Sequence, residues 1–128
     1  MRAVDTNVLV RLIARDDQRQ TAAAEDFIQA GAWVSLLVLV EAVWVLGAVY
    51  ELTPLQQANG IQMLLSHRQL VLQDFETVTV ALDQFKAKPT LGFSDCLILE
   101  LARKAGHLPL GTFDRGLAKV PGTQKLFS

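Results

Sequence analysis

The most constraining feature of this 128-residue chain is an apolar run over residues 32–50, AWVSLLVLVEAVWVLGAVY, whose only charged side chain is Glu41. A run of this length could span a bilayer. However, a carboxylate at the bilayer centre is costly, and no cluster of lysine or arginine flanks the run. We therefore expect a short strand at Trp33-Val34 followed by a core helix from Leu36 to Tyr50.

Glu41 is the anomaly of that helix, because an ionised carboxylate is unfavourable among apolar side chains unless water or a partner compensates it. Two interpretations are open. Glu41 lies on the one solvated stripe of the helix, or it faces a cation in a cleft.

The rest of the chain alternates short apolar strands with helices. Residues 2–4, 33–34, 70–72 and 108–111 have strand character, with an edge strand at residues 125–127. Helices are expected from Val8 onward and over residues 18–29, 36–50, 54–66 and 76–87, with a last one opened by Ser94-Asp95. Thr53-Pro54 is a typical helix start, a cap followed by a first-turn proline. This alternation predicts an α/β fold in one domain, residues 1–128, with a parallel sheet between helices.

Composition narrows the class of protein. Hydrophobic residues make up 51% of the chain and charged residues 20%, which excludes intrinsic disorder. The single cysteine, Cys96, cannot form an intramolecular disulfide and is expected in the core; a reducing, cytoplasmic location is the simpler expectation. Charges at Arg2 and Asp5 interrupt any apolar leader, so we expect no signal peptide. The two tryptophans and the phenylalanines are expected in the core.

The net charge of -1 conceals an uneven distribution. Residues 1–85 hold five basic and ten acidic side chains, whereas residues 86–128 hold seven basic and three acidic ones. The last third of the chain is therefore basic, which suits a nucleic-acid partner. Uneven charge on solvated faces would explain the same numbers.

Acidic side chains follow the predicted strands. Asp5 comes directly after the first strand and Asp114 after the strand at 108–111; Asp95 opens a helix, and Glu41 lies about two turns beyond a strand. Sites in parallel sheets lie at the carboxyl ends of the strands. If the four acids converge, their repulsion calls for protons or divalent cations, and an all-oxygen set suits Mg²⁺ or Mn²⁺ rather than Zn²⁺.

Such an acidic pocket is suited to phosphodiester hydrolysis. Each acid also has a structural explanation: Asp5 as a helix cap, Asp95 as a first-turn acid of a Ser94-capped helix, and Asp114 as a turn residue. Supporting roles are expected for the polar side chains next to the acids. These are Thr6, Asn7 and Thr112, which could orient carboxylates or be plain caps, and Arg115, which could contact a phosphate or be solvated.

Four segments in this order resemble the PIN-domain ribonucleases, and among them a VapC-type toxin of a toxin–antitoxin pair. They are Asp5-Thr6-Asn7-Val8-Leu9-Val10-Arg11, Ser35 with Glu41, Phe93-Ser94-Asp95-Cys96-Leu97-Ile98, and Gly111-Thr112-Phe113-Asp114-Arg115. The resemblance covers essentially the whole chain.

The resemblance implies a three-layer α/β/α PIN-like fold with a central parallel sheet of about five strands. It implies a Mg²⁺- or Mn²⁺-dependent endoribonuclease with Asp5, Glu41, Asp95 and Asp114 as catalytic and metal-binding acids, Asp5 and Asp95 being direct ligands. It further implies an RNA substrate, a cognate antitoxin protein laid across the active-site groove, and a homodimer.

Three other functions are consistent with parts of this pattern. An aspartate-nucleophile phosphatase of the haloacid dehalogenase type also places an aspartate after its first strand, but it needs a second acid where this chain has Asn7. A non-catalytic binding module on the same fold would use the acids as caps or as a structural ion site. A PIN-type RNA-processing nuclease that is not a toxin would share the whole acidic set.

Overall fold

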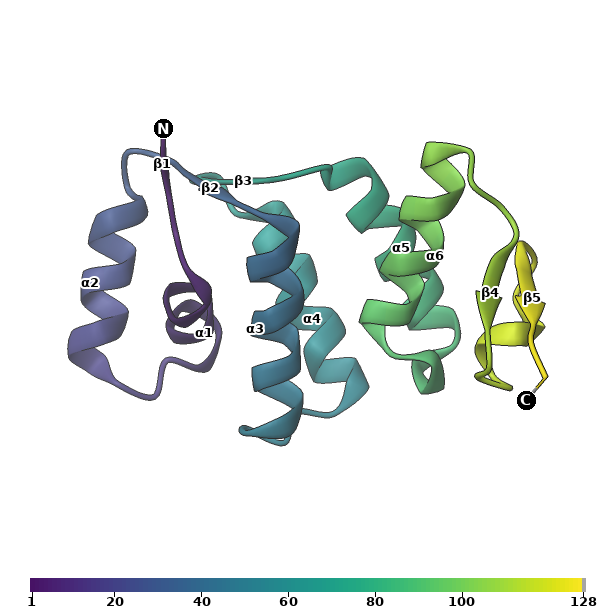
Figure 1. Ribbon diagram of the computed structural model, residues 1–128. Coiled ribbons are helices and arrows are strands. Elements are labelled where there is room, and N and C mark those ends of the chain that lie inside the picture. Colours follow the sequence, from purple (N-terminus) through teal and green to yellow (C-terminus); the bar gives the residue numbers. More distant parts are fainter. Residues whose placement is uncertain (128) are drawn as a thin grey trace. The chain divides into compact units, whose positions relative to one another are not determined.

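The computed structural model describes residues 1–127 and divides the chain into two compact units. The first unit comprises residues 1–75 and the second begins at Glu76. Figure 1 shows the elements of each unit in sequence colours. Each unit is built from short parallel strands and helices, which bears out the predicted mixed α/β class.

The first unit contains a three-stranded parallel sheet with four helices. Its elements are β1 (Arg2–Ala3), α1 (Thr6–Ala14), α2 (Gln18–Ile28), β2 (Ala32–Val34), α3 (Leu36–Ala48), α4 (Pro54–Ser66) and β3 (Leu70–Leu72). The strand order is β1-β2-β3, and Trp33 in the central strand pairs with Ala3 on one side and Val71 on the other. The carboxyl ends of all three strands therefore lie at one edge, followed by Asp5, Ser35 and the segment that leads to Phe75.

Side-chain caps start all four helices of this unit. Asp5, Asp17, Ser35 and Thr53 each accept a backbone N–H from the first turn of the helix that follows. Thr53 also forms a reciprocal capping box with Gln56, so the start predicted from Thr53-Pro54 is confirmed. These caps satisfy amide groups that the helix itself cannot bond.

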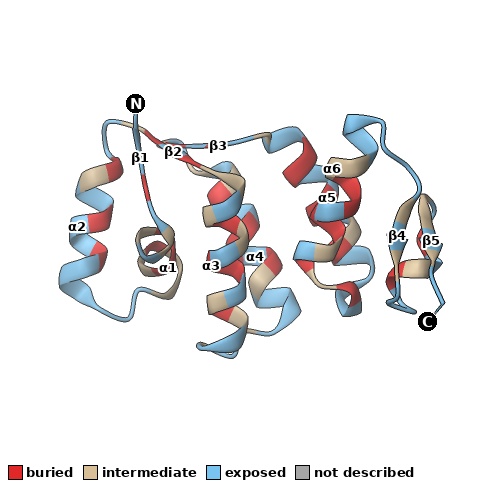
Figure 2. Ribbon diagram, in the orientation of Figure 1, coloured by how far each residue is buried: buried red, intermediate tan, exposed pale blue. Residues whose placement is uncertain are grey.

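The core of the first unit lies where α1 packs on α2 and α3, and where α3 packs on α4. Leu9, Leu39, Leu46, Ile61 and Leu64 are each at most 1% exposed there. Figure 2 shows buried residues, in red, at intervals along each helix of this unit. The expectation that the tryptophans and phenylalanines belong to the core is wrong for both tryptophans, since Trp33 is 38% and Trp44 67% exposed, and also for Phe75, Phe113 and Phe127, which are exposed.

The second unit places two helices beside a two-stranded parallel sheet. Its elements are α5 (Phe75–Ala87), the 3-10 turn Pro89–Leu91, α6 (Phe93–Ala105), β4 (Leu110–Thr112), the 3-10 turn Leu117–Lys119 and β5 (Thr123–Lys125). Phe85 of α5 and Phe93 of α6 meet edge to face, with ring centroids 6.2 Å apart. This pair fills the core between the two helices.

Two expectations about the strands need correction. In place of one sheet of about five strands, the described residues form a three-stranded sheet and a separate two-stranded one. The last strand is Thr123–Lys125 rather than residues 125–127: Gly122, at φ +97°, turns the chain into it, and the Leu126 N–H donates to the Thr112 carbonyl at its end. Strands of two or three residues carry too little periodicity to reveal their partners.

The apolar run folds as the predicted strand and helix, except that α3 ends at Ala48 instead of Tyr50. It is 13 residues long. Among residues 1–127, no helix has both the length and the apolar character to cross a membrane.

Candidate active site

Asp5 lies at the junction between β1 and α1. Strand pairing fixes the backbone just before Asp5. Ala3 pairs with Trp33, and the Val4 N–H donates to the Trp33 carbonyl at 3.2 Å. Its Oδ1 accepts the Val8 N–H at 3.4 Å, a long bond by ordinary standards, and the side chain is exposed. Asp5 is thus a helix cap whose carboxylate still has oxygen lone pairs available for another partner.

Glu41 is exposed on α3, one and a half turns after the Ser35 cap. The residues three and four positions away on the same stripe, Trp44 and Leu37, are 67% and 74% exposed. Glu41 makes no hydrogen bond or ion pair with any of residues 1–127. It is therefore an unpaired carboxylate on an exposed, mostly apolar stripe of the helix.

Asp95 and Asp114 are close enough to influence each other electrostatically. Asp95 lies half-buried in the first turn of α6, where burial and then the charge of Asp114 raise its pKa above the usual range. The expectation that Ser94 caps this helix is wrong. The helix begins at Phe93, and its N-cap is Gly92 at φ +82°, which offers no side-chain bond.

Asp114 is held by the turn that follows β4. Its N–H donates to the Thr112 hydroxyl at 3.0 Å, and its Oδ1 accepts the Leu117 N–H at 2.8 Å. The turn role predicted for Asp114 is thus observed, and the Thr112 hydroxyl holds the backbone of this acid. The second carboxylate oxygen of Asp114 has no bonding partner within residues 1–127.

The four predicted acids are divided between the two units. Asp5 and Glu41 belong to the first unit, and Asp95 and Asp114 belong to the second. No group of three or more aspartate, glutamate, histidine or cysteine side chains in residues 1–127 is arranged to hold a metal ion. Convergence of all four acids stays a prediction. The Asp95–Asp114 pair fits a hard divalent cation by its chemistry, because it offers only oxygen and its negative charges disfavour each other.

The remaining predicted residues lie next to the acids along the chain. Thr6 is half-buried and Asn7 exposed in the first turn of α1, and Arg115 is exposed beside Asp114. Cys96 is fully buried, as predicted. Burial first, and then the charges of Asp95 and Glu100, raise the pKa of its thiol to about 11.

Sequence reasoning missed a polar network around Arg11. Its guanidinium donates to the Tyr50 hydroxyl at 2.7 Å, to Asp16 at 3.2 Å and to the Gln20 side-chain carbonyl. The Tyr50 hydroxyl in turn donates to Asp16 at 2.9 Å. No local pattern could reveal this network, because Tyr50 lies 39 residues from Arg11.

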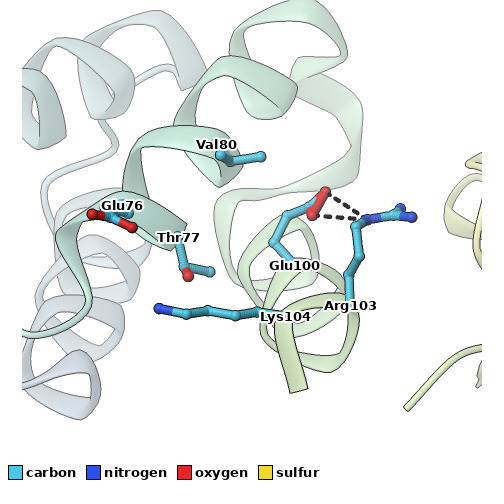
Figure 3. Close-up of a pocket in the computed structure, with 6 residues that line it drawn as sticks. All are labelled: Glu76, Thr77, Val80, Glu100, Arg103 and Lys104. Atoms are coloured by element: carbon cyan, nitrogen blue, oxygen red, sulfur yellow. Dashed lines mark hydrogen bonds and ion pairs between the residues drawn. The ribbon is translucent and has the colours of Figure 1, made fainter. Parts of the chain in front are cut away.

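A second missed feature is the ion pair between the buried Glu100 and the exposed Arg103 on α6. The side chain of Glu100 is 8% exposed, and its Oε2 lies 3.0 Å from the Arg103 Nε. Figure 3 shows this pair beside a pocket of about 310 Å³ between α5 and α6, into which Thr77 and Lys104 also project. The i,i+3 spacing of opposite charges was the available signal. None of the four predicted acids lines this pocket.

Comparison with known proteins gives one result. The sequence model of the PIN domain family matches residues 2–123 and so spans both structural units. Searches of the curated proteins and of the solved structures return no match.

Proposed function

Because the chain belongs to the PIN domain family, whose members are generally metal-dependent nucleases, we propose that it is a Mg²⁺- or Mn²⁺-dependent endoribonuclease that hydrolyses RNA phosphodiester bonds. The observation that carries the proposal is the Asp95–Asp114 pair, two carboxylates whose charges influence each other and for which the structure of residues 1–127 gives no basic partner. A family match over residues 2–123 supports treating residues 1–128 as one functional domain.

In this proposal all four acids form one site. Asp5 and Asp95 would hold a divalent cation, and Glu41 and Asp114 would complete the site as ligands or through water. A bound cation would stabilise charge on the attacking and leaving oxygens of the phosphodiester. The protein's part is orientation: α1 fixes Asp5 through the Val8 amide, and the Thr112 hydroxyl and Leu117 amide fix Asp114.

Three neighbouring polar residues complete the proposed site. Thr6 and Asn7, in the first turn of α1, would orient the Asp5 carboxylate or a water beside it. Arg115 is exposed next to Asp114, where its guanidinium can contact a phosphate of the RNA. The seven basic side chains in residues 86–128 would hold the rest of the backbone.

An RNA cleavage assay with variants tests the nuclease activity. Wild-type protein should cut structured RNA with Mg²⁺ and not with EDTA, and Asp95→Asn should lose at least about a hundredfold of the rate. Asp83→Asn, an exposed aspartate on α5, is the matched control and should cut like wild type. Since Asp95 is disfavoured as an anion by burial, Asp95→Asn should fold at least as well as wild type. Equal cleavage by both variants would refute the assignment.

We further assign the chain to the VapC-type toxins of type II toxin–antitoxin systems, acting in the cytoplasm. The order of its motifs supports this subtype. Expression in a bacterium should arrest growth, and co-expression of the small protein encoded next to it should restore growth and co-purify with the chain. Arrest that persists in Asp95→Asn would contradict a toxicity based on cleavage.

A homodimer is part of the same proposal. It is supported by large apolar side chains that are exposed on α3 and α4, among them Leu37, Trp44 and Leu55. Sedimentation at micromolar concentration should show a species of twice the chain mass. A clean monomer would contradict the dimer and leave the nuclease proposal intact.

A further inference from the structure

A pocket of about 380 Å³ lies between α1 and α2 in the first unit. Its volume falls in the range of small-ligand sites, about 300–1,000 Å³. On α2 it is lined by residues spaced three and four positions apart, Gln20, Ala23, Ala24 and Phe27, and thus by one face of that helix. The two alanines leave the middle of this face open, so the space between the helices is not filled by side chains.

The two ends of this pocket can be distinguished by their contacts. At one end, Arg11 near the close of α1 bonds Gln20 near the start of α2. At the other end, the guanidinium of Arg2 lies over the Phe27 ring at 3.8 Å and donates to the Phe27 carbonyl at 3.0 Å. Arg2 belongs to β1, the strand that leads into Asp5. Asn7, which lines the same pocket, is two residues from Asp5, so the α1 side of the pocket lies near the predicted acid.

The polar groups that line this pocket include two side-chain amides, those of Asn7 and Gln20. Asn7, which lines it two residues after Asp5, makes no side-chain hydrogen bond within residues 1–127. The Gln20 amide nitrogen is also without a partner there, since only its carbonyl is bonded by Arg11. The lining thus offers an aromatic ring and two unused amide groups, and no carboxylate.

We propose that this pocket binds one unpaired nucleobase of the RNA, next to the phosphate that is cut. The inference rests on the proposed ribonuclease function. A flat purine or pyrimidine has a π-face for Phe27 and an edge of donors and acceptors for the amide of Asn7. Arg2 on one face of Phe27 fixes the ring, because a cation over an aromatic face is attractive.

Arg11 serves as a positioning residue in this pocket. Its charge is directed to Tyr50 and Asp16, and the Tyr50 hydroxyl, followed by the Asp16 charge, raises its pKa against the opposing effect of desolvation. The guanidinium, which is charged at any ordinary pH, holds the Gln20 carbonyl. This contact turns the Gln20 amide nitrogen into the group left for a ligand.

The test measures binding of labelled single-stranded RNA pentamers in EDTA, by fluorescence anisotropy, so that no cleavage is needed. One base at a time is replaced by an abasic site. Wild-type protein should lose about five- to a hundredfold in affinity at one position, the range for loss of a base stacked on an aromatic ring. Phe27→Leu should bind intact RNA with an affinity lowered by the same factor. Its affinity should not fall further when the base at that position is removed.

Matched variants separate base recognition from general damage. Phe127→Leu changes another phenylalanine that lies under a cation, Lys125, and should bind like wild type. Asn7→Ala should remove the preference among the four bases at the identified position, whereas Asn59→Ala, an exposed asparagine on α4, should keep it. Phe27→Leu keeps apolar volume, and its melting temperature should stay near that of wild type.

Several results would overturn the pocket assignment. One is an equal loss of RNA affinity at the abasic position in wild type and in Phe27→Leu, and another is the absence of RNA binding. A third is that the pocket variants weaken only the binding of an antitoxin peptide. The last would make the pocket a peptide groove. A protein that cleaves RNA with Mg²⁺ but shows no Phe27-dependent position refutes only the pocket. If one position depends on Phe27 but the protein never cleaves RNA, only the proposed nuclease activity is refuted.

Discussion

Asp5 allows its role as a helix cap to be separated from its proposed role as a metal ligand, because Asp17 is a cap of the same type. The Asp17 Oδ1 accepts the Gln20 N–H at 3.0 Å, whereas the bond from Val8 to Asp5 is 3.4 Å. Loss of an aspartate cap costs about 0.5–2 kcal/mol. We therefore expect Asp17→Ala to lower the free energy of unfolding by about 1 kcal/mol and Asp5→Ala by about 0.5 kcal/mol when no divalent cation is present.

Magnesium should reverse the ranking of the two variants. A ligand at a hundred times its Kd stabilises the folded state by about 2.7 kcal/mol, which is about 10 °C in Tm for a chain of this size. Wild type and Asp17→Ala should both gain that much, and Asp5→Ala should gain little. Asp5→Asn, which keeps the capping ability, should be as stable as wild type without Mg²⁺ and equally unresponsive to it.

The assay is thermal unfolding followed by circular dichroism, with and without MgCl₂, on wild type and these variants. The same samples are tested for RNA cleavage. If Asp5→Ala and Asp17→Ala show the same gain in Tm with Mg²⁺, then Asp5 is only a cap and the proposed site lacks its first ligand.

Further predictions concern the second unit. Asp114→Asn should lower the pKa of Asp95 toward the usual range, but only in part, because burial contributes more to the shift than the charge of Asp114 does; carbon-detected NMR titration of the metal-free protein measures it, and an unchanged pKa would mean that the two acids do not interact. Cys96, with its thiol pKa of about 11, should react with a disulfide reagent at pH 8 far more slowly in the native protein than in urea; equal rates would contradict its burial. Arg103→Met should destabilise the fold more than Arg115→Met, since only the former leaves a buried carboxylate, Glu100, unpaired; equal melting temperatures would show that the ion pair contributes nothing.

The sequence predicted helices well because their ends carry local chemical signals. Thr53-Pro54 marked the start of α4, and the polar residues after the first strand marked the start of α1. The prediction failed at α6, where Ser94 was expected to cap and the helix begins one residue earlier at Phe93. Gly92 provides the turn there by its backbone, at a positive φ, and such a start leaves no side-chain signature.

Strand pairing and contacts between residues distant in the sequence could not be predicted, for a different reason. Strands of two or three residues have no usable alternation, so the separation into three strands and two could not be predicted. The bond between Arg11 and Tyr50 joins residues 39 apart, and no local pattern encodes it. The four acids were singled out because each lies at or within about two helical turns of the end of a strand or the start of a helix, and their convergence stays a prediction. The exposure of Trp44 was missed because residue type alone does not tell which face of a helix is covered.

The central claim is that Asp5, Glu41, Asp95 and Asp114 bind a divalent cation together. Crystals of the protein soaked in MnCl₂ and measured near the manganese absorption edge test it directly. The account predicts an anomalous difference peak bounded by carboxylate oxygens of these acids, with Asp5 and Asp95 in direct contact. A peak at other acids, such as Asp16 and Asp17, would contradict this claim. The absence of any peak at the four acids would contradict it as well.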